Sequence, residues 1–581
     1  MVYVPILGLL HNPHGKRAMR SDHATPFEIV AQAAPRWCRS QAAELVLQFE
    51  NGNSSQRTFA QQAGVPRSTL QHWLKRKKNL DADPALVAFF ESPTGLAFLH
   101  RLMIACHLTF TQQGTCGIRL VCVFLRRTGL NHLVASSFGS QQAVACQLEQ
   151  VILDYGVSQR SHLASQMTPK SITACEDETF HPQVCLVSIE PVSDFILLEV
   201  YCQGRDATSW TSQLTAALEG LPVEVVQVTS DEAKGLLAHA RDGLGAHHSP
   251  DLFHVQHEVG KATSLSIRSQ TNQAQIDLDR ARHQTQQWIE RRDAYQQGQR
   301  RPGRPPDFER RIAESRGLEQ TMAARVEATQ ERQQRMRQAI QGLGDDYHPF
   351  DLLSGTPCDA DAVRQRLTTR FAAIERIAEE SDLALKARER IAKARRVLGA
   401  MVATIAWVWQ VIRMRVDSLR LPPPLQQVLI EQLIAGPYLV RVAAQAHSPA
   451  ERATIRRVAD RLLAQARAPD GPLAALPAEQ RAVIEREAAW CADLFQRSSS
   501  CVEGRNGQLS LRHHHLHQLS PRKLKVLTII HNYLIRRPDG TTAAERFFGA
   551  KPQDLFEYVL DRLDVPARPA VPRSNRNQSA A

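Results

Sequence analysis

The chain has 581 residues, of which 43% are hydrophobic and 22% charged, a composition that fits several folded domains and excludes collagen-like and disordered classes. Its net charge is +12, and the positive excess lies at both ends of the chain. Residues 1–80 hold 11 basic and 4 acidic side chains, and residues 501–581 hold 13 basic and 7 acidic ones. We therefore expect a polyanionic partner, with a solvated basic surface as the alternative. Eleven scattered cysteines without a C-x-x-C pair, and Pro5 inside the first apolar run, argue against disulfides and a signal peptide and favour a cytoplasmic protein.

Residues 1–80 are expected to hold a DNA-binding region. Three short helices are predicted, over Ala42–Phe49, Gln56–Ala63 and Arg67–Lys78, with Gly64 in the turn before the last one. The string FAQQAGVPRSTLQHWLK resembles a helix-turn-helix, and a three-helix bundle without a ligand is the alternative. The residues offered to a major groove would be Arg67, Ser68, Thr69, Gln71 and His72, followed by the basic Lys75, Arg76, Lys77 and Lys78.

Residues 81–165 are expected to be helical, with no legible role, and the pattern then changes to short β-rich runs. The predicted strands are ITACEDETF (172–180), QVCLVSIEP (183–191), FILLEVYCQ (195–203), VEVVQVTSD (223–231) and DLFHVQ (251–256), with helices over Ala207–Leu218 and Glu232–Arg241. The order β-β-β-α-β-α-β predicts an α/β core with a mixed five-stranded sheet, in which three meander strands are joined by crossover helices to parallel ones.

Residues 262–490 are expected to be helical throughout. Apolar seams at alternating three- and four-residue spacing predict a long antiparallel hairpin over 262–345, broken by the Pro/Gly-rich GQRRPGRPPD. The most apolar run, Val397–Ile412, is shorter than the roughly 20 residues that span a bilayer, so we expect a buried helix and no membrane association. Residues 551–581 are predicted to hold a helix followed by a disordered tail.

Two aspartates stand where the predicted sheet favours a metal site. Asp177 lies in the first strand and points to the opposite face from Glu176 and Glu178, whereas Asp231 follows the fourth strand, at a sheet edge that commonly binds ligands. If these strands are neighbours, the carboxylates approach each other, and such hard oxygen ligands favour Mg²⁺. Two ions about 4 Å apart are able to promote phosphoryl transfer. The alternatives are a helix N-cap for Asp231 and a solvent-facing strand residue for Asp177.

The strings ACEDETFHPQVCLVSIEPVSDFILLEVY, VVQVTSDEAKGL and PDLFHV resemble the RNase H-like catalytic core of bacterial insertion-sequence DDE transposases. HNYLIRRPDGTTAAERFFG (531–549) is similar to the carboxyl-terminal stretch of many such enzymes, and the resemblance covers residues 171–260 and 495–550. It implies that Asp177, Asp231 and Glu503 are the catalytic metal ligands for two Mg²⁺ ions, with Mn²⁺ as a possible substitute. Because 272 residues separate Asp231 from Glu503, it also implies a large helical insertion, as some members carry.

The long insertion leaves other glutamates open as the third carboxylate, namely Glu451, Glu479, Glu485 and Glu487. Glu503 is favoured because it heads a basic, amide-rich helix that could meet scissile DNA, and a surface glutamate is the alternative. His254, at the end of the fifth predicted strand, is expected either to contact substrate or to be a core histidine. The run Arg512 to His517 contains neighbouring histidines that point in different directions, so phosphate contact is favoured over zinc binding. Further expected phosphate contacts are Arg505, Arg512, Arg522, Lys523 and Lys525.

The expected organisation is a helix-turn-helix region (1–80), a helical region (81–165), the first part of the RNase H-like core (166–261), the helical insertion (262–490), the last part of the core with the catalytic helix (491–550), and a terminal helix with tail (551–581). The resemblance implies a transposase that binds terminal inverted repeats and target DNA as a homodimer or higher multimer, in a bacterial, nucleoid-associated setting. It would cleave and transfer strands with metal. The alternatives are a catalytically silent, transposase-derived regulator and a nuclease on the same core.

Overall fold

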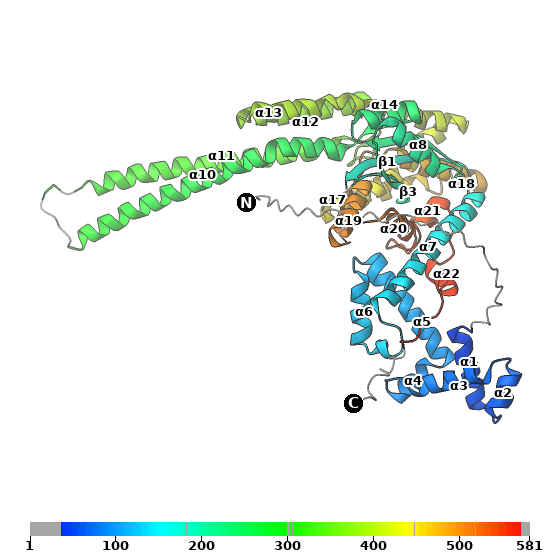
Figure 1. The fold of residues 1–581 in the computed structure, drawn as a ribbon. Helices are drawn as coiled ribbons and strands as arrows, with labels where there is room; N and C mark the ends of the chain where they lie inside the picture. The colour runs from blue at the N-terminus through cyan, green and yellow to red at the C-terminus, as the bar shows by residue number, and fades with distance from the viewer. Residues whose placement is uncertain are drawn as a thin grey trace, which may run out of the picture. The chain divides into compact units, whose positions relative to one another are not determined.

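The computed structural model describes residues 37–180, 183–298, 303–304, 306–446, 448–516 and 519–570 (Figure 1). The chain forms two compact units, Met1–Phe98 and Leu99–Ala581. Most of the predicted disordered tail lies outside the described residues, as do the first 36 residues of the predicted helix-turn-helix region.

The first unit contains the three helices that the sequence predicts. They are α1 (Arg39–Asn51), α2 (Gln56–Gln62) and α3 (Arg67–Lys78), and α4 (Pro84–Phe90) follows. Gly64 adopts φ +64° between α2 and α3, a left-handed conformation that glycine tolerates best. The helices pack through one buried apolar cluster, made of Ala42, Val46, Ala60, Val65, Leu70 and Trp73.

Helices also fill the stretch before the sheet, as predicted for residues 81–165. These are α5 (Pro93–His107), the π-helical turn η1 (Leu108–Gln113), α6 (Ile118–Arg127), the short η2 (Leu130–His132) and the long α7 (Phe138–Gln166). Ser137 caps α7 by accepting a hydrogen bond from the backbone N–H of Ser140 at 3.1 Å. Leu148, Ile152 and Tyr155 of α7 lie in the buried cluster that covers one face of the sheet.

The sheet is mixed and five-stranded, which confirms the α/β prediction. Its strands are β1 (Lys170–Phe180), β2 (Val184–Glu190), β3 (Phe195–Cys202), β4 (Val223–Ser230) and β5 (His247–Pro250), in the order β3-β2-β1-β4-β5. The first three strands are antiparallel neighbours, whereas β4 pairs parallel with β1 and β5 parallel with β4. The connections run through α8 (Ala207–Leu218) and through α9 (Lys234–Ala238), which continues as η3 (His239–Gly243).

The position of the fifth strand was predicted wrongly. DLFHVQ is not a strand: β5 is the preceding HHSP, and Leu252 begins the 45-residue helix α10 (Leu252–Gln296). Asp251 caps that helix, because its Oδ1 accepts a hydrogen bond from the backbone N–H of Phe253 at 2.8 Å. A short polar strand at a sheet edge lacks the apolar alternation on which the prediction relied.

The insertion is helical, as predicted, and starts earlier than residue 262. After α10 come α11 (Phe308–Asp346), α12 (Ala360–Glu380), α13 (Leu385–Arg396), α14 (Leu398–Ser418), α15 (Pro423–Val428) with η4 (Leu429–Ile434), α16 (Ala435–Gln445), α17 (Pro449–Ala466) and α18 (Ala478–Leu494). Helices α10 and α11, drawn in green in Figure 1, form the predicted long hairpin. Ala274 and Leu278 of α10 pack against Val326 of α11 along its seam.

Within the described ranges, one helical stretch, Leu385–Ser418, is long and apolar enough to cross a membrane by length and composition. Of its most apolar window, 39% is buried inside the protein. Met401, Ile405 and Val408 of α14 belong to the large apolar core of the insertion, so the predicted buried helix is buried in part.

The remaining helices are α19 (Ser500–Leu516), α20 (Pro521–Tyr533), α21 (Ala543–Phe548) and α22 (Leu555–Arg562). Val502 and Leu509 of α19 pack against Cys175, Val187 and Ile189, so α19 covers one face of the sheet. The opposite face carries Ala174 and Leu186, which share a buried cluster with Trp210 of α8. The two faces of β1 therefore meet different helices.

Candidate metal centre

The segment just before α19 lies across the sheet and decides where α19 begins. The carbonyl of Gln496 accepts hydrogen bonds from Gln227 Nε2 and Thr229 Oγ1 of β4, both at 3.2 Å. Two residues later, the carbonyl of Ser498 lies 3.6 Å from the thiol of Cys175 in β1, which donates to it. Contacts to two adjacent strands thus fix the start of the helix that carries Glu503.

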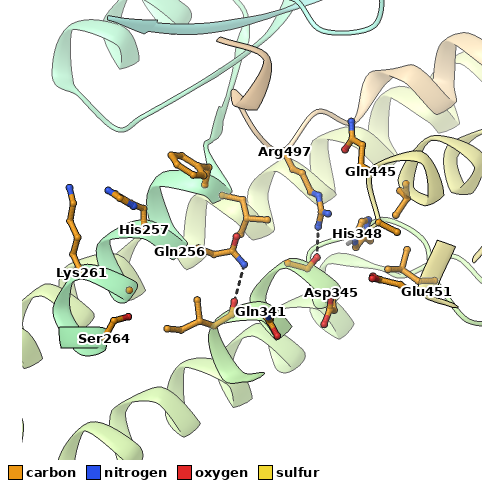
Figure 2. A pocket seen from close by; sticks show the side chains of 18 of the residues that line it. Gln256, His257, Lys261, Ser264, Gln341, Asp345, His348, Gln445, Glu451 and Arg497 are labelled. Atoms are coloured by element: carbon orange, nitrogen blue, oxygen red, sulfur yellow. Dashed lines mark hydrogen bonds between the residues drawn. The ribbon is translucent and has the colours of Figure 1, made fainter. Parts of the chain in front are cut away.

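Arg497 joins this segment to both ends of the helical hairpin. Its carbonyl accepts a hydrogen bond from the backbone N–H of Leu252, at the start of α10, at 2.9 Å. Its guanidinium donates to the carbonyl of Gly344, near the end of α11 (Figure 2). The chain therefore leaves the sheet and returns to it at the same place, so the insertion does not separate Glu503 from the strands.

A cavity of about 830 Å³ lies beside this junction, and Figure 2 shows its lining from α10, α11 and Arg497. Gln256 spans one side of it and donates to the carbonyl of Ile340 at 2.9 Å. None of the three predicted metal-ligating acids lines the cavity. The cavity and the acids are separate features of this region.

Asp177, His254 and Glu503 come together from β1, α10 and α19. Each offers one atom suited to a metal, and these atoms all lie within 4.8 Å of one another. His254 Nε2 is 3.6 Å from Glu503 Oε1 and 3.7 Å from Asp251 Oδ2. Residues far apart in the sequence thus form one group with two carboxylates and an imidazole.

Asp177 faces this group because side chains alternate along β1. Asn506 of α19 donates from Nδ2 to Asp177 Oδ2 at 3.0 Å. The neighbouring Glu178 points the other way and accepts a hydrogen bond from Trp210 Nε1 at 3.3 Å, and Glu176 lies 3.4 Å from His239 on that same side. The predicted separation of Asp177 from the two glutamates is confirmed.

The electrostatics around Asp177 favour a bound proton or cation. Burial, together with the nearby negative charges of Glu503 and Asp231, raises the pKa of its carboxyl to about 7, against the lowering effects of the Glu178 backbone N–H and of His254. A carboxylate with this environment gains stability when positive charge is placed beside it.

Asp231 lies at the end of β4, the parallel neighbour of β1, as the metal hypothesis requires. Its Oδ1 accepts a hydrogen bond from the backbone N–H of Ala233 at 3.0 Å, which orders the turn into α9. It does not cap that helix, whose N-cap is Ala233. Its charge acts on Asp177, but Asp231 is not one of the three residues in the close group.

His254 lies in the first turn of α10 rather than at a strand end, because β5 stops at Pro250. Its side chain is 32% exposed, yet its Nε2 atom is shielded and has no hydrogen-bond partner among the described residues. The shielded nitrogen thus lies within ion-pair distance of two carboxylates without a hydrogen bond to either.

The other candidates for the third carboxylate lie elsewhere in the insertion. Glu451 lines the cavity of Figure 2, Glu485 pairs with Arg467 at 3.2 Å, Glu487 lies 3.7 Å from Arg415, and Glu479 is exposed in the first turn of α18. Glu503, by contrast, belongs to the group that contains Asp177.

Most of the predicted DNA-binding residues lie on the exposed, polar face of α3. Arg67, Ser68, Gln71, His72, Lys75 and Lys78 are exposed, whereas Thr69, Arg76 and Lys77 are half-buried. Lys77 forms an ion pair with Glu50 at 2.6 Å, and Gln71 donates to Gln56 at 3.2 Å. Leu70 and Trp73 face the core of the bundle, leaving the polar side chains outside.

Three of the predicted basic contacts near α19 are instead held by protein groups. Arg505 is 5% exposed and forms a bidentate ion pair with Glu199 of β3, both N–O distances being 2.7 Å, so its guanidinium is held inside the protein and the DNA contact stays a prediction. Arg512 donates to two carbonyls of η1 at 2.7 Å and to the carbonyl of Gly114 at 3.0 Å, and Lys523 bonds to Gln112 and Glu149. Burial lowers the pKa of Lys523.

The last two predicted basic residues lie nearer the surface. Arg522 donates to the carbonyl of Cys146 at 3.2 Å and is 45% exposed, and Lys525 is exposed. Among the described residues, the histidines of α19 enter no group with metal-binding geometry.

Sequence reasoning missed Asp251 and Ser499, whose hydrogen bond joins the start of α10 to the start of α19. Asp251 is 1% exposed, and its Oδ2 accepts a short hydrogen bond from the Ser499 hydroxyl while its Oδ1 caps α10. An aspartate placed just before an apolar run is an N-cap signal, and reading DLFHVQ as a strand concealed it.

A model for a family of unknown function (DUF6399) matches residues 429–576, a range that includes Glu503 and all of α19 to α22. No curated protein and no solved structure matches the chain.

Proposed function

We propose that the protein is a DDE-type DNA transposase that binds the ends of its own element and performs metal-dependent strand cleavage and transfer. The observation that carries this proposal is the approach of Glu503 to Asp177 across the long helical insertion, with Asp231 at the end of the adjacent strand. A catalytic set of carboxylates requires such convergence, whereas a glutamate that served only as a surface residue of α19 would not need to lie near Asp177.

The sheet supports the proposal as well. An RNase H-like core, which the resemblance implies, needs three antiparallel strands followed by two parallel ones, with the first strand in the middle. The order β3-β2-β1-β4-β5 has that arrangement, and β1 carries Asp177 on the face that α19 covers.

The donor set fits a divalent metal. Asp177 and Glu503 supply carboxylate oxygens, Asp231 supplies a third negative charge, and the Oδ1 atom of Asn506 is buried without a hydrogen-bond partner among the described residues. These residues would hold Mg²⁺ or Mn²⁺, which supply Lewis-acid activation of an attacking oxygen and charge stabilisation at the leaving oxygen.

The chain's own residues prepare the site. Asn506 holds the Asp177 carboxylate by donating to Oδ2, and Asp251 fixes the starts of α10 and α19 relative to each other. The exposed residues of α3 would bind element ends through groove and phosphate contacts. Double-stranded DNA is thus the proposed partner, a homodimer or higher multimer the proposed working form, and the bacterial cytoplasm, on the nucleoid, the proposed location.

The test is a strand-cleavage and strand-transfer assay with the full chain and DNA that flanks its gene. Wild type, Glu503→Gln and Asp231→Asn are compared with and without Mg²⁺, with Glu487→Gln as a matched helical control and a gel shift as the binding readout. We expect both acidic-site variants to bind DNA but to lose cleavage by on the order of 10³-fold, several kcal/mol of transition-state stabilisation.

Each other outcome selects a different function. Binding without cleavage by wild type would overturn the enzyme and favour a transposase-derived regulator. Cleavage without strand transfer would favour a nuclease on the same core. Full activity of Glu503→Gln would remove Glu503 from the catalytic set.

A further inference from the structure

We propose that His254 is a direct metal ligand through Nε2, and that the centre formed with Asp177 and Glu503 therefore selects a divalent transition metal such as Mn²⁺ over Mg²⁺. This inference deepens the proposed function, on which it rests for the presence of a metal. It adds a nitrogen ligand to a site for which sequence reasoning expects oxygen ligands only.

The position of His254 is the first support. Its Nε2 lies 3.6 Å from Glu503 Oε1 and belongs to the group whose ligand atoms are all within 4.8 Å of one another. These spacings are suited to three donors around one ion, because metal–ligand bonds of about 2.0–2.2 Å place neighbouring ligand atoms roughly 3–4 Å apart.

The lack of a partner is the second support. Nε2 is shielded from solvent and accepts or donates no hydrogen bond among the described residues. A shielded polar atom without a hydrogen bond destabilises the fold, so this arrangement is expected where a ligand satisfies the atom.

A second side chain, from a different helix, independently points to a bound ligand. Asn506 is 9% exposed, its Nδ2 donates to Asp177, and its Oδ1 has no partner among the described residues. Its amide is directed at the same carboxylate that faces His254. A buried acceptor without a hydrogen bond, on the side chain that contacts Asp177, is expected where a further group binds.

Hydrogen bonds fix the backbone on both sides of the contact between His254 and Glu503. Asp251 caps α10 through Oδ1 and accepts from Ser499 through Oδ2, which joins the first turn of α10 to the start of α19. His254 and Glu503 both lie within one turn of these anchors. The imidazole and the carboxylate therefore meet in a preset geometry, as a metal centre requires.

The identity of the donors decides the metal class. Mg²⁺ is a hard cation that takes oxygen ligands and sheds water reluctantly. Imidazole nitrogen is better matched to transition metals, whose affinity for mixed nitrogen and oxygen sites rises from Mn²⁺ along the first row. A centre with one imidazole and two carboxylates is thus biased away from Mg²⁺.

The experiment measures Mn²⁺ binding to the purified full chain without DNA. Electron paramagnetic resonance follows the loss of free Mn²⁺ signal, and pulsed measurements detect coupling to an imidazole ¹⁴N nucleus. The variants are His254→Gln, which keeps size and polarity, and the matched control His257→Gln, which alters an exposed histidine one turn further along α10. Competition with Mg²⁺ gives the selectivity.

We expect ¹⁴N coupling in wild type and in His257→Gln, and its loss in His254→Gln with Mn²⁺ affinity lower by about 10- to 100-fold. Mg²⁺ affinity should change much less, so the preference for Mn²⁺ shrinks. Bound Mn²⁺ without ¹⁴N coupling in wild type, or unchanged coupling in His254→Gln, would overturn the assignment even if the enzyme cleaves DNA. Nitrogen-coupled Mn²⁺ in a protein that does not cleave DNA would uphold it and overturn the proposed function.

Discussion

Three consecutive acidic residues of β1 point to opposite faces of the sheet and lie in different environments there. Glu176 and Glu178 turn toward the α8 side, where Ser188 donates to Glu176 and Trp210 and Arg205 donate to Glu178. Asp177 turns toward α19, where its neighbours are an amide, an imidazole and two further carboxylates. On the α8 face each glutamate receives a donor, although Glu176 Oε2 has no hydrogen-bond partner among the described residues, whereas the α19 face brings acids together.

This contrast teaches how to separate structural acids from functional ones. A buried carboxylate that receives hydrogen bonds is stabilised by them, whereas carboxylates packed beside one another destabilise the fold unless a cation joins them. The α19 face retains that unfavourable arrangement, and perturbed carboxyls in such clusters are common at functional sites.

The largest expected difference between the faces is in activity. Asp177→Asn should abolish Mn²⁺ binding and reduce DNA cleavage by on the order of 10³-fold, because the replaced oxygen carries the charge that holds the metal. Glu178→Gln should retain most of both, since an amide still accepts the hydrogen bond from Trp210. Metal binding and cleavage, measured on the two variants in parallel, check this. Equal losses would mean that the faces do not differ in function.

The second difference is in stability, and it concerns arginines. Arg505→Met should lower the free energy of unfolding by about 3–5 kcal/mol, because it leaves the fully buried Glu199 without its ion-pair partner. Arg205→Met removes the partner of Glu178 on the other face, where the arginine side chain is 63% exposed, and should cost less than about 1 kcal/mol.

Urea unfolding of both variants and of the double variant Arg505→Met/Glu199→Gln measures these values. The double variant should recover part of the loss, because it no longer leaves a buried charge unpaired. A loss below about 1 kcal/mol for Arg505→Met would return Arg505 to the set of residues available to DNA.

The smallest effect is a pH dependence at the sheet edge, where polar groups are buried uncharged. Burial, with a contribution from the Arg241 charge, lowers the pKa of His248 in β5 to about 4. The unfolded chain takes up this proton near the ordinary value of about 6.5, so stability is full above that pH and is lost progressively as the pH falls toward 4. His248→Gln, which keeps the contact with Ser230, should show a smaller fall in Tm between pH 7.5 and 5. An identical fall in both proteins would contradict the prediction.

Sequence reasoning predicted the elements whose signal is local. Helices α3 and α8 begin and end where periodicity placed them, and four of the five strands were found, because apolar alternation marks buried strands. β5 was missed because HHSP has no such alternation. The burial of Arg505 was missed for another reason: its partner Glu199 comes from a distant strand, and a helical pattern does not reveal which polar side chain finds a partner inside.

The residues of the candidate site also fall into those that the sequence could predict and those that depend on a tertiary contact. Asp177 and Asp231 could be predicted from strand order and strand ends, and Glu503 from the resemblance. The nearness of His254 and the inward amide of Asn506 depend on how α10 and α19 start at Asp251 and Ser499, a tertiary contact between segments that the whole insertion separates.

The meeting of Leu252 with Arg497 also has a consequence for biosynthesis. Strands β1 to β5 leave the ribosome before the insertion is made, and at about 5–20 residues per second roughly 12–50 s pass before α19 follows. Throughout this interval Cys175, Val187 and Ile189 lack their cover from Val502 and Leu509. The nascent sheet thus presents an exposed apolar surface during translation, and Glu503 reaches Asp177 and His254 only after nearly all of the chain has been synthesised.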